Sequence, residues 1–175
     1  DSTDAWIEGN IFLHAHRDPN RTDDARDTSA AISGGVDFAG QFSEWTVINN
    51  LFYDVDHATL NKGGGSPGAG RFVFVNNTLV HVAKESGAGL TNDIAAFDFT
   101  DDGVPLPDPA YGAGAYVAGN IIWDCPQLVS NYNPSNHTVI FENNILPLAW
   151  TGPGSNNVVI DPHLNLSLIT NVAAA

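Results

Sequence analysis

Histidine and aspartate residues recur at one position just beyond a repeated sequence phrase, four residues after the last asparagine of the phrase. The residues at this place are, in chain order, His14, Asp54, His81, Asp124 and Leu148. If the phrases stack at the ~4.8 Å spacing of neighbouring strands, imidazole and carboxylate groups would pair alternately. Such pairs shift each other's pKa values and could serve catalysis or hold a metal ion. They could equally form a hydrogen-bonded polar ladder at the end of a sheet, and the sequence leaves both interpretations open.

The phrase itself has seven residues and occurs five times. Its copies span residues 6–12, 46–52, 73–79, 116–122 and 140–146. Aligned on their last asparagine, the copies are apolar three residues before it and two residues after it, and the residue just before it is Gly or Asn. Apolar columns are typical of strands that face a shared core. Gly and Asn tolerate the positive φ of a tight bend, so each phrase predicts a strand, a bend and a second strand.

The bends predict how the units assemble. They are centred on Asn10, Asn50, Asn77, Asn120 and Asn144. Because a strand–bend–strand unit cannot bury its apolar side alone, the units must stack, and stacked asparagines can hydrogen-bond as a ladder. The rival is an antiparallel sandwich, but hairpin turns favour Asn-Gly or Asp-Gly over the Gly-Asn and Asn-Asn seen here. We therefore expect an all-β, single-domain solenoid of about five coils over residues 1–175, with 147–175 as a C-terminal extension or end segment.

The bends and apolar columns resemble those of the right-handed parallel β-helix proteins, the pectate-lyase-like superfamily. The resemblance runs from about Trp6 to Asn144 and is specific for the fold rather than for function. It implies three parallel sheets per turn, with the asparagine ladder at the bend between the second and third sheets. The first sheet is then expected within residues 29–32, 58–62, 94–99 and 127–132. We also expect the chain to be part of a longer solenoid.

The resemblance also implies a binding surface. In that superfamily the groove beside the first sheet binds polysaccharide, and acidic residues there can hold calcium. Asp54, Asp56 and Asp98 supply oxygen ligands of the type that calcium prefers, and they are the calcium ligands expected here. Surplus aspartate that simply solvates the surface is the alternative.

Lyase chemistry would need further residues. It removes the proton beside a uronic-acid carboxylate, which requires a positioned base and a cation that neutralises the carboxylate. Lys62, at the end of an expected first-sheet strand, and His57 are the candidate bases, and Arg17 could clamp a carboxylate with two hydrogen bonds. A solvated lysine at a strand end is the simpler interpretation of Lys62. The sequence lacks the consecutive-Asp and His-Gly motifs of polygalacturonases and the Arg-Pro motif of pectate lyases.

Aromatic residues suggest binding without cleavage. Tyr53 and Trp123 follow a ladder asparagine by three residues, so strand alternation predicts that they point away from the core. Together with Tyr111 and Tyr132 they could stack on sugar rings, although a single aromatic residue more often serves packing.

Composition excludes several classes of function. The 175 residues include only six Lys and Arg against twenty Asp and Glu, for a net charge of −14. So few basic residues cannot neutralise a phosphate backbone against this excess of acid, so nucleic acid is not an expected partner. Apolar runs are too short for a transmembrane helix of ~20 residues, so no membrane insertion is expected. The single Cys125 excludes an internal disulfide framework.

The sequence thus predicts an extracellular or cell-surface module that engages polysaccharide along its parallel sheets. One alternative is a lyase-like enzyme that uses Lys62 or His57 as base and calcium as electrophile. Another is a purely structural solenoid of a surface layer, filament or adhesin, with further coils or other chains stacked at its ends. Calcium is the one cofactor that the residues suggest.

Overall fold

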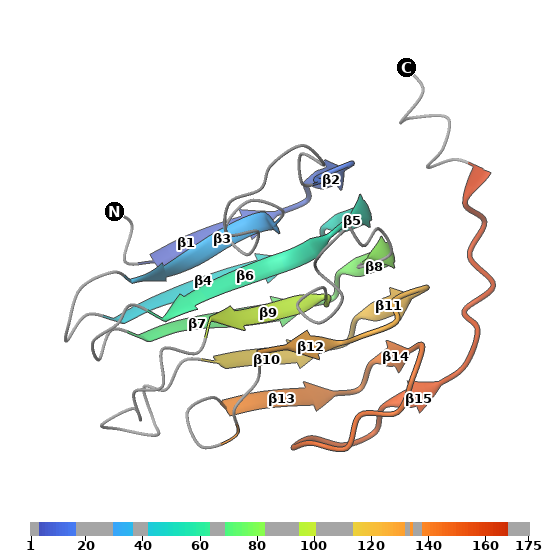
Figure 1. Cartoon of the computed structure of the whole chain (residues 1–175). Helices are drawn as coiled ribbons and strands as arrows, with labels where there is room; N and C mark the ends of the chain where they lie inside the picture. Colours follow the sequence, from blue (N-terminus) through green and yellow to red (C-terminus); the bar gives the residue numbers. More distant parts are fainter. Residues whose placement is uncertain are drawn as a thin grey trace.

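The structure, a computed structural model, describes residues 4–16, 30–36, 42–63, 69–82, 95–100, 114–131, 134 and 138–167. Its strands, between residues 4 and 159, are arranged in three parallel sheets as Figure 1 shows. Arg17, Tyr111 and Tyr132 lie outside the described residues. Within the described part of the chain, no helix is both long and apolar enough to cross a membrane.

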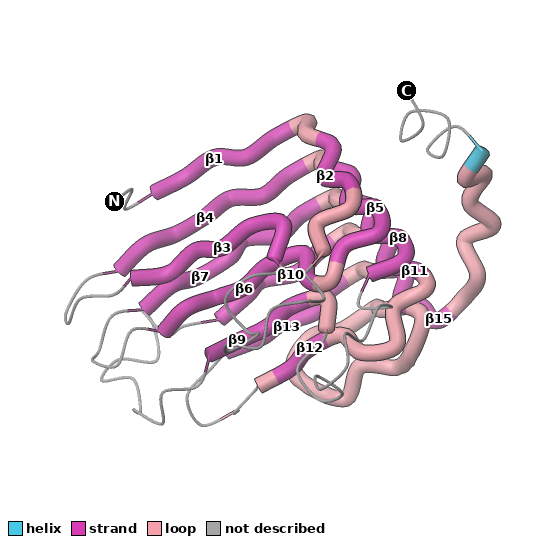
Figure 2. Tube along the Cα trace, turned by 45° about the horizontal axis from the view of Figure 1, so that its top comes forward, coloured by secondary structure: helices cyan, strands magenta, loops and turns pink. Residues whose placement is uncertain are grey.

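The first two sheets meet at the asparagine bends. The β1 sheet, in spatial order, consists of β1 (Asp4–Glu8), β4 (Phe42–Ile48), β7 (Ala69–Val75), β10 (Gly114–Ala118) and β13 (Thr138–Glu142). The β2 sheet, in the same direction, consists of β2 (Ile11–Leu13), β5 (Leu51–Val55), β8 (Thr78–Val82), β11 (Ile121–Trp123), β14 (Ile145–Leu146) and β15 (Val158–Val159). Figure 2 shows the tube bending sharply between β1 and β2 and stepping down one strand per turn.

The third sheet completes each turn. The β3 sheet consists of β3 (Ala30–Val36), β6 (His57–Gly63), β9 (Phe97–Thr100) and β12 (Val129–Ser130). Each of these strands overlaps a segment that the sequence predicts for the first sheet. The chain visits the three sheets in turn and every strand pair is parallel, which is the arrangement of a β-solenoid. The antiparallel sandwich is therefore wrong.

The strand register reproduces the sequence alignment. Ile7 pairs with Val47, Val47 with Phe74, Phe74 with Val117, and Val117 with Phe141. The last four side chains are fully buried. Burying an aliphatic or aromatic side chain of this size stabilises a fold by about 1.5–3 kcal/mol, so the predicted apolar columns are the core.

The asparagine ladder is present and longer than predicted. In each rung the backbone N–H and the side-chain Nδ2 of one asparagine donate to Oδ1 of the asparagine below it. The ladder runs through Asn144 to a sixth member, Asn157, whose Oδ1 accepts both bonds at 3.1 and 2.8 Å. The residue before each of these bends has a positive φ, as the Gly and Asn pattern predicts.

The segment after Asn144 therefore continues the solenoid. β15 pairs in parallel with β14, Ile145 with Val158 and Leu146 with Val159. Trp150 packs on Phe141 with ring centroids 4.7 Å apart and covers this end of the core. Beyond β15 the described chain leaves the stack of strands (Figures 1 and 2). Residues 147–175 are thus in part a further coil and not only an extension.

Candidate functional site

The histidine–aspartate column lies at the corner that follows the β2 sheet. His14, Asp54, His81 and Asp124 all have a left-handed backbone, with φ of 53°, 56°, 55° and 53°. His and Asp are among the few non-glycine residues that adopt this conformation with some frequency, because their short polar side chains make local hydrogen bonds. The same backbone at each turn places the four side chains one above another.

These side chains pair alternately, as the sequence predicts. Nδ1 of His14 lies 2.7 Å from Oδ2 of Asp54, and Nδ1 of His81 contacts Oδ2 of Asp124. Between the two pairs lies the ring of Tyr53, whose centroid is 5.2 Å from that of His81 and 6.3 Å from that of His14, edge-on to both.

Tyr53 is correspondingly covered. Its exposed fraction is 9%, so the expectation that it offers an open ring face to a sugar is wrong. It does point away from the core, but the imidazoles of the neighbouring coils enclose it. Trp123, at the same place of β11, is only partly buried.

The pair nearest β2 is part of a larger group, which we call the histidine–aspartate cluster: His14, His16, Asp54 and Asp56. Nε2 of His16 lies 3.2 Å from Oδ2 of Asp54, and Nδ1 of His16 lies 3.0 Å from Oδ1 of Asp56. One nitrogen each of His14 and His16 and one oxygen of Asp54 lie within 4.8 Å of one another. Asp56 is buried, and His14 is about half exposed.

The cluster shifts the pKa values of its members in opposite directions. Burial by itself lowers the pKa of His16, but hydrogen bonds and charge interactions with Asp56 and Asp54 outweigh burial, so the pKa lies above 6.5. Burial likewise raises the pKa of Asp54, but hydrogen bonds from His14 and His16 outweigh it, so the pKa lies below 3.8. The charged forms of His16 and Asp54 therefore stabilise each other.

The cluster could have been found from the sequence by extending the alignment two residues further. His16 follows His14 at the same interval as Asp56 follows Asp54, so the two pairs occupy the same two columns of adjacent coils. The sequence predicts a site role for Asp54 and Asp56, and none was expected for His16.

The three expected calcium ligands do not form one site. Asp98 lies on β9 opposite Leu60, four residues along the chain from Asp56, which is about 13 Å of extended strand. Its Oδ1 accepts bonds from Ser130 and Asn131 at 2.7 and 2.8 Å, and its buried Oδ2 has no hydrogen-bond partner among the residues that the structure describes. Calcium contacts its ligands at about 2.3–2.6 Å, so no single ion could reach both Asp98 and the cluster.

The candidate catalytic residues are also spread out. His57 and Lys62 both belong to β6, five residues and about 16 Å of strand apart. The His57 side chain is 2% exposed, and its Nδ1 lies 2.8 Å from the carbonyl oxygen of Ala95. The structure thus makes His57 a buried packing residue and places the backbone of Lys62 at the far end of the same strand.

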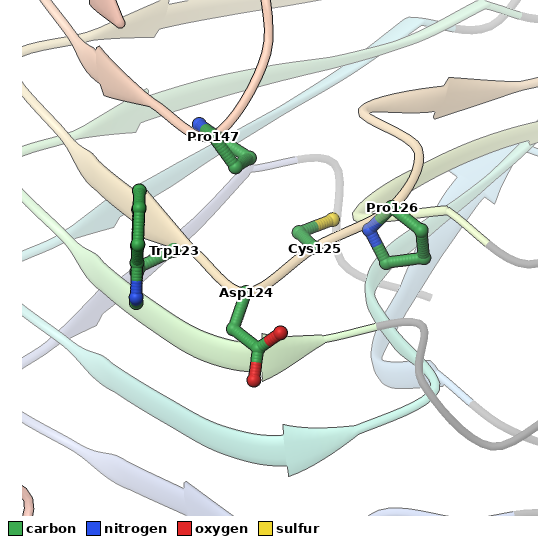
Figure 3. Close-up of a pocket in the computed structure, with 5 residues that line it drawn as sticks. All are labelled: Trp123, Asp124, Cys125, Pro126 and Pro147. Carbon is green, nitrogen blue, oxygen red and sulfur yellow. The ribbon is translucent and has the colours of Figure 1, made fainter. Parts of the chain in front are cut away.

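A separate open groove of about 600 Å³ lies beside Trp123 (Figure 3). It is lined by Trp123, Asp124, Cys125, Pro126 and Pro147. Cys125 contributes little chemistry, because its thiol is buried, donates to the carbonyl oxygen of Gln127 at 3.0 Å, and has its pKa raised by burial to about 12. The groove therefore combines one partly exposed indole, one carboxylate and two rigid proline rings.

Comparisons with known proteins do not extend these observations: no family model, no curated protein and no solved structure matches the chain.

Proposed function

We propose that the chain is a right-handed parallel β-helix of the pectate-lyase-like kind that acts as an extracellular or cell-surface polysaccharide-binding module. The observation that carries the proposal is the groove at Trp123, which is lined by a partly exposed indole and by Asp124. Right-handedness is favoured because connections between parallel strands of one sheet are right-handed in about 98% of known cases.

The groove has the chemistry of a sugar subsite. The C–H face of a pyranose ring is apolar and stacks on an indole, whereas its hydroxyl groups need hydrogen-bond acceptors. A carboxylate has about four acceptor positions, so Asp124 can accept from a sugar hydroxyl while it holds His81. The prolines on either side keep the groove open without losing side-chain entropy on binding.

The charge of the chain narrows the substrate class. At −14, the protein repels an acidic glycan unless a cation bridges the two. We therefore propose a neutral polysaccharide as the ligand, with a uronic-acid polymer bound only in the presence of calcium.

A pair of tryptophan variants tests this proposal. Trp123→Ala removes the stacking surface in the groove, whereas Trp6→Ala removes an indole that is 67% exposed on β1 and outside the groove. In affinity electrophoresis against a panel of neutral and acidic polysaccharides, W123A should weaken binding about tenfold and W6A should leave it unchanged. Equal effects, or no binding by the wild type, would contradict the proposal. Absorbance of unsaturated products in the same mixtures reports whether bound glycan is also cleaved.

A structural role is the second candidate, and the two outer strands of the stack favour it. Ile11 on β2 and Val158 and Val159 on β15 are each more than half exposed. An open strand edge with apolar side chains can pair with another strand. We expect further β-structure, from the same protein or another copy, to stack there. Val159→Lys, which charges the edge, should then reduce concentration-dependent association in sedimentation experiments, and association equal to that of the wild type would contradict this role.

A further inference from the structure

The histidine–aspartate cluster has more donors than a polar ladder needs. A ladder is complete with one imidazole and one carboxylate per pair, as at His81 and Asp124. At the other end of the column, His16 adds a second imidazole to the same carboxylate oxygen that His14 contacts. Three side chains from two coils thus direct their donor atoms to one point.

The spacing of these donors is close to that of metal ligands, since all three lie within 4.8 Å of one another. Ligands that hold a tetrahedral ion at about 2.0–2.1 Å lie about 3.3 Å from one another. Nε2 of His16 is 3.2 Å from Oδ2 of Asp54, close to this value, whereas Nδ1 of His14 is 2.7 Å from the same oxygen, at hydrogen-bond distance. The His14 side chain must therefore move outward when an ion binds, and because it is about half exposed it has room to do so.

Asp56 supplies the support that a metal-binding histidine usually has. A ligating imidazole almost always gives its other ring nitrogen to a carboxylate or carbonyl, which fixes the ring orientation. Nδ1 of His16 is 3.0 Å from Oδ1 of the buried Asp56, so Nε2 is the nitrogen presented to the cluster. Backbone hydrogen bonds hold the two corners together, from Asp56 N–H to Ala15 O at 3.1 Å and from His14 N–H to Tyr53 O at 3.2 Å.

The donor types select the class of ion. Calcium and magnesium require oxygen ligands, six to eight for calcium, and this cluster offers two imidazoles and one carboxylate. Imidazole with carboxylate suits zinc, copper, nickel and cobalt instead. Three protein donors would leave one of four positions to water.

We propose that His14, His16 and Asp54 form a binding site for one divalent transition-metal ion, with Asp56 as the residue that positions His16. The site would bridge the first two coils at their exposed corner. The site is separate from the proposed polysaccharide groove. That groove lies at β11, which is two strands from β5 and three strands from β2 in the β2 sheet.

Zinc titration of the metal-stripped protein, in competition with a chromogenic zinc indicator, tests the proposal. We expect one equivalent of zinc to bind, and a 100-fold excess of calcium to leave it in place. His14→Gln, His16→Gln and Asp54→Asn should each lower the affinity more than tenfold. His81→Gln is the matched control, because it removes an imidazole from the same column at a place where the described residues bring no second histidine to the carboxylate. It should bind zinc as the wild type does.

Two further measurements separate the roles of the residues. Asp56→Asn should keep one equivalent of zinc but lower its affinity by about 10–100-fold, as expected for a residue that orients a ligand. Bound Cu²⁺ should show nitrogen hyperfine splitting from two imidazoles, reduced to one in H16Q. The proposal is overturned if no zinc competes with the indicator, if H81Q loses affinity as H16Q does, or if calcium displaces zinc.

Discussion

Removing one central rung of the asparagine ladder should destabilise the protein far more than removing an outer rung. Asn77 is buried, and its side chain joins three successive coils. Its Oδ1 accepts from N–H and Nδ2 of Asn50 at 2.9 and 3.0 Å. Its Nδ2 donates to Val47 O, Val75 O and Asn120 Oδ1 at 2.9, 3.0 and 3.2 Å. Asn77→Ala deletes all five contacts and leaves their partners inside the fold.

The cost follows from those partners. A buried polar group that loses its hydrogen-bond partner costs about 1–3 kcal/mol. The N–H of Asn50 and the carbonyl oxygen of Val47 each lose a partner, whereas Val75 O keeps a bond from Asn49 N–H at 3.3 Å. Asn77→Ala should therefore lower the free energy of unfolding by about 3–5 kcal/mol. Asn10→Ala, at the exposed outer rung, removes only donations to Glu8 O and Asn50 Oδ1 and should cost about 1 kcal/mol or less.

Urea unfolding followed by far-ultraviolet circular dichroism measures both variants. A stack of coils can unfold in more than one step, so tryptophan fluorescence should be recorded in parallel to show whether the two probes report one transition. If Asn77→Ala costs less than about 1 kcal/mol, or no more than Asn10→Ala, then the ladder does not stabilise the stack and water replaces the lost amide.

Three further predictions concern single positions. Gly9→Ala and Gly119→Ala should each lower the free energy of unfolding in urea by about 1 kcal/mol, because both glycines have a positive φ, of 68° and 65°. The added methyl group at Gly119 also lies 2.4 Å from Oδ1 of Asn76, but that exposed side chain can rotate away, so a much larger loss at Gly119 than at Gly9 would contradict this. The pairing of His16 with Asp54 should stabilise the fold most between about pH 3.8 and 6.5. The contribution of His16 is complete below pH 6.5 and is lost as the pH rises through its raised pKa, whereas that of Asp54 is complete above pH 3.8 and is lost as the pH falls through its lowered pKa. A difference in unfolding free energy between wild type and His16→Gln that grew above pH 7 would contradict this. Cys125, buried and with a pKa of about 12, should react with a thiol reagent only after unfolding, and rapid labelling of the native protein would show that the corner at Pro126 opens.

The stacking of the strands into coils could be predicted because the evidence for it lies in residue types that recur at aligned positions of the repeated phrase, rather than in local secondary-structure propensity. Apolar columns and asparagine bends repeat at irregular intervals, yet each copy has the same internal spacing, and the strand register follows that spacing residue for residue. The sixth bend was missed because its copy is short: Asn157 follows Asn144 by only 13 residues and is preceded by Pro and Gly rather than by an apolar strand. The two valines that follow Asn157, Val158 and Val159, were the feature of the sequence that could have indicated this bend.

The site was only partly predictable, because it depends on what happens after a strand ends. Counting along extended strands places His14 and His16 on the same face and gives no reason for them to share one carboxylate. The left-handed corner at His14 and at Asp54 turns the chain, so that residues two positions apart converge instead of lying in line. The same corner brings the imidazoles against Tyr53, which strand alternation alone would leave exposed. On this reasoning, replacing His14 by a residue that does not favour a left-handed backbone should disturb the whole cluster, whereas a substitution that keeps that backbone, such as His14→Asn, should remove one donor and leave His16 and Asp56 paired.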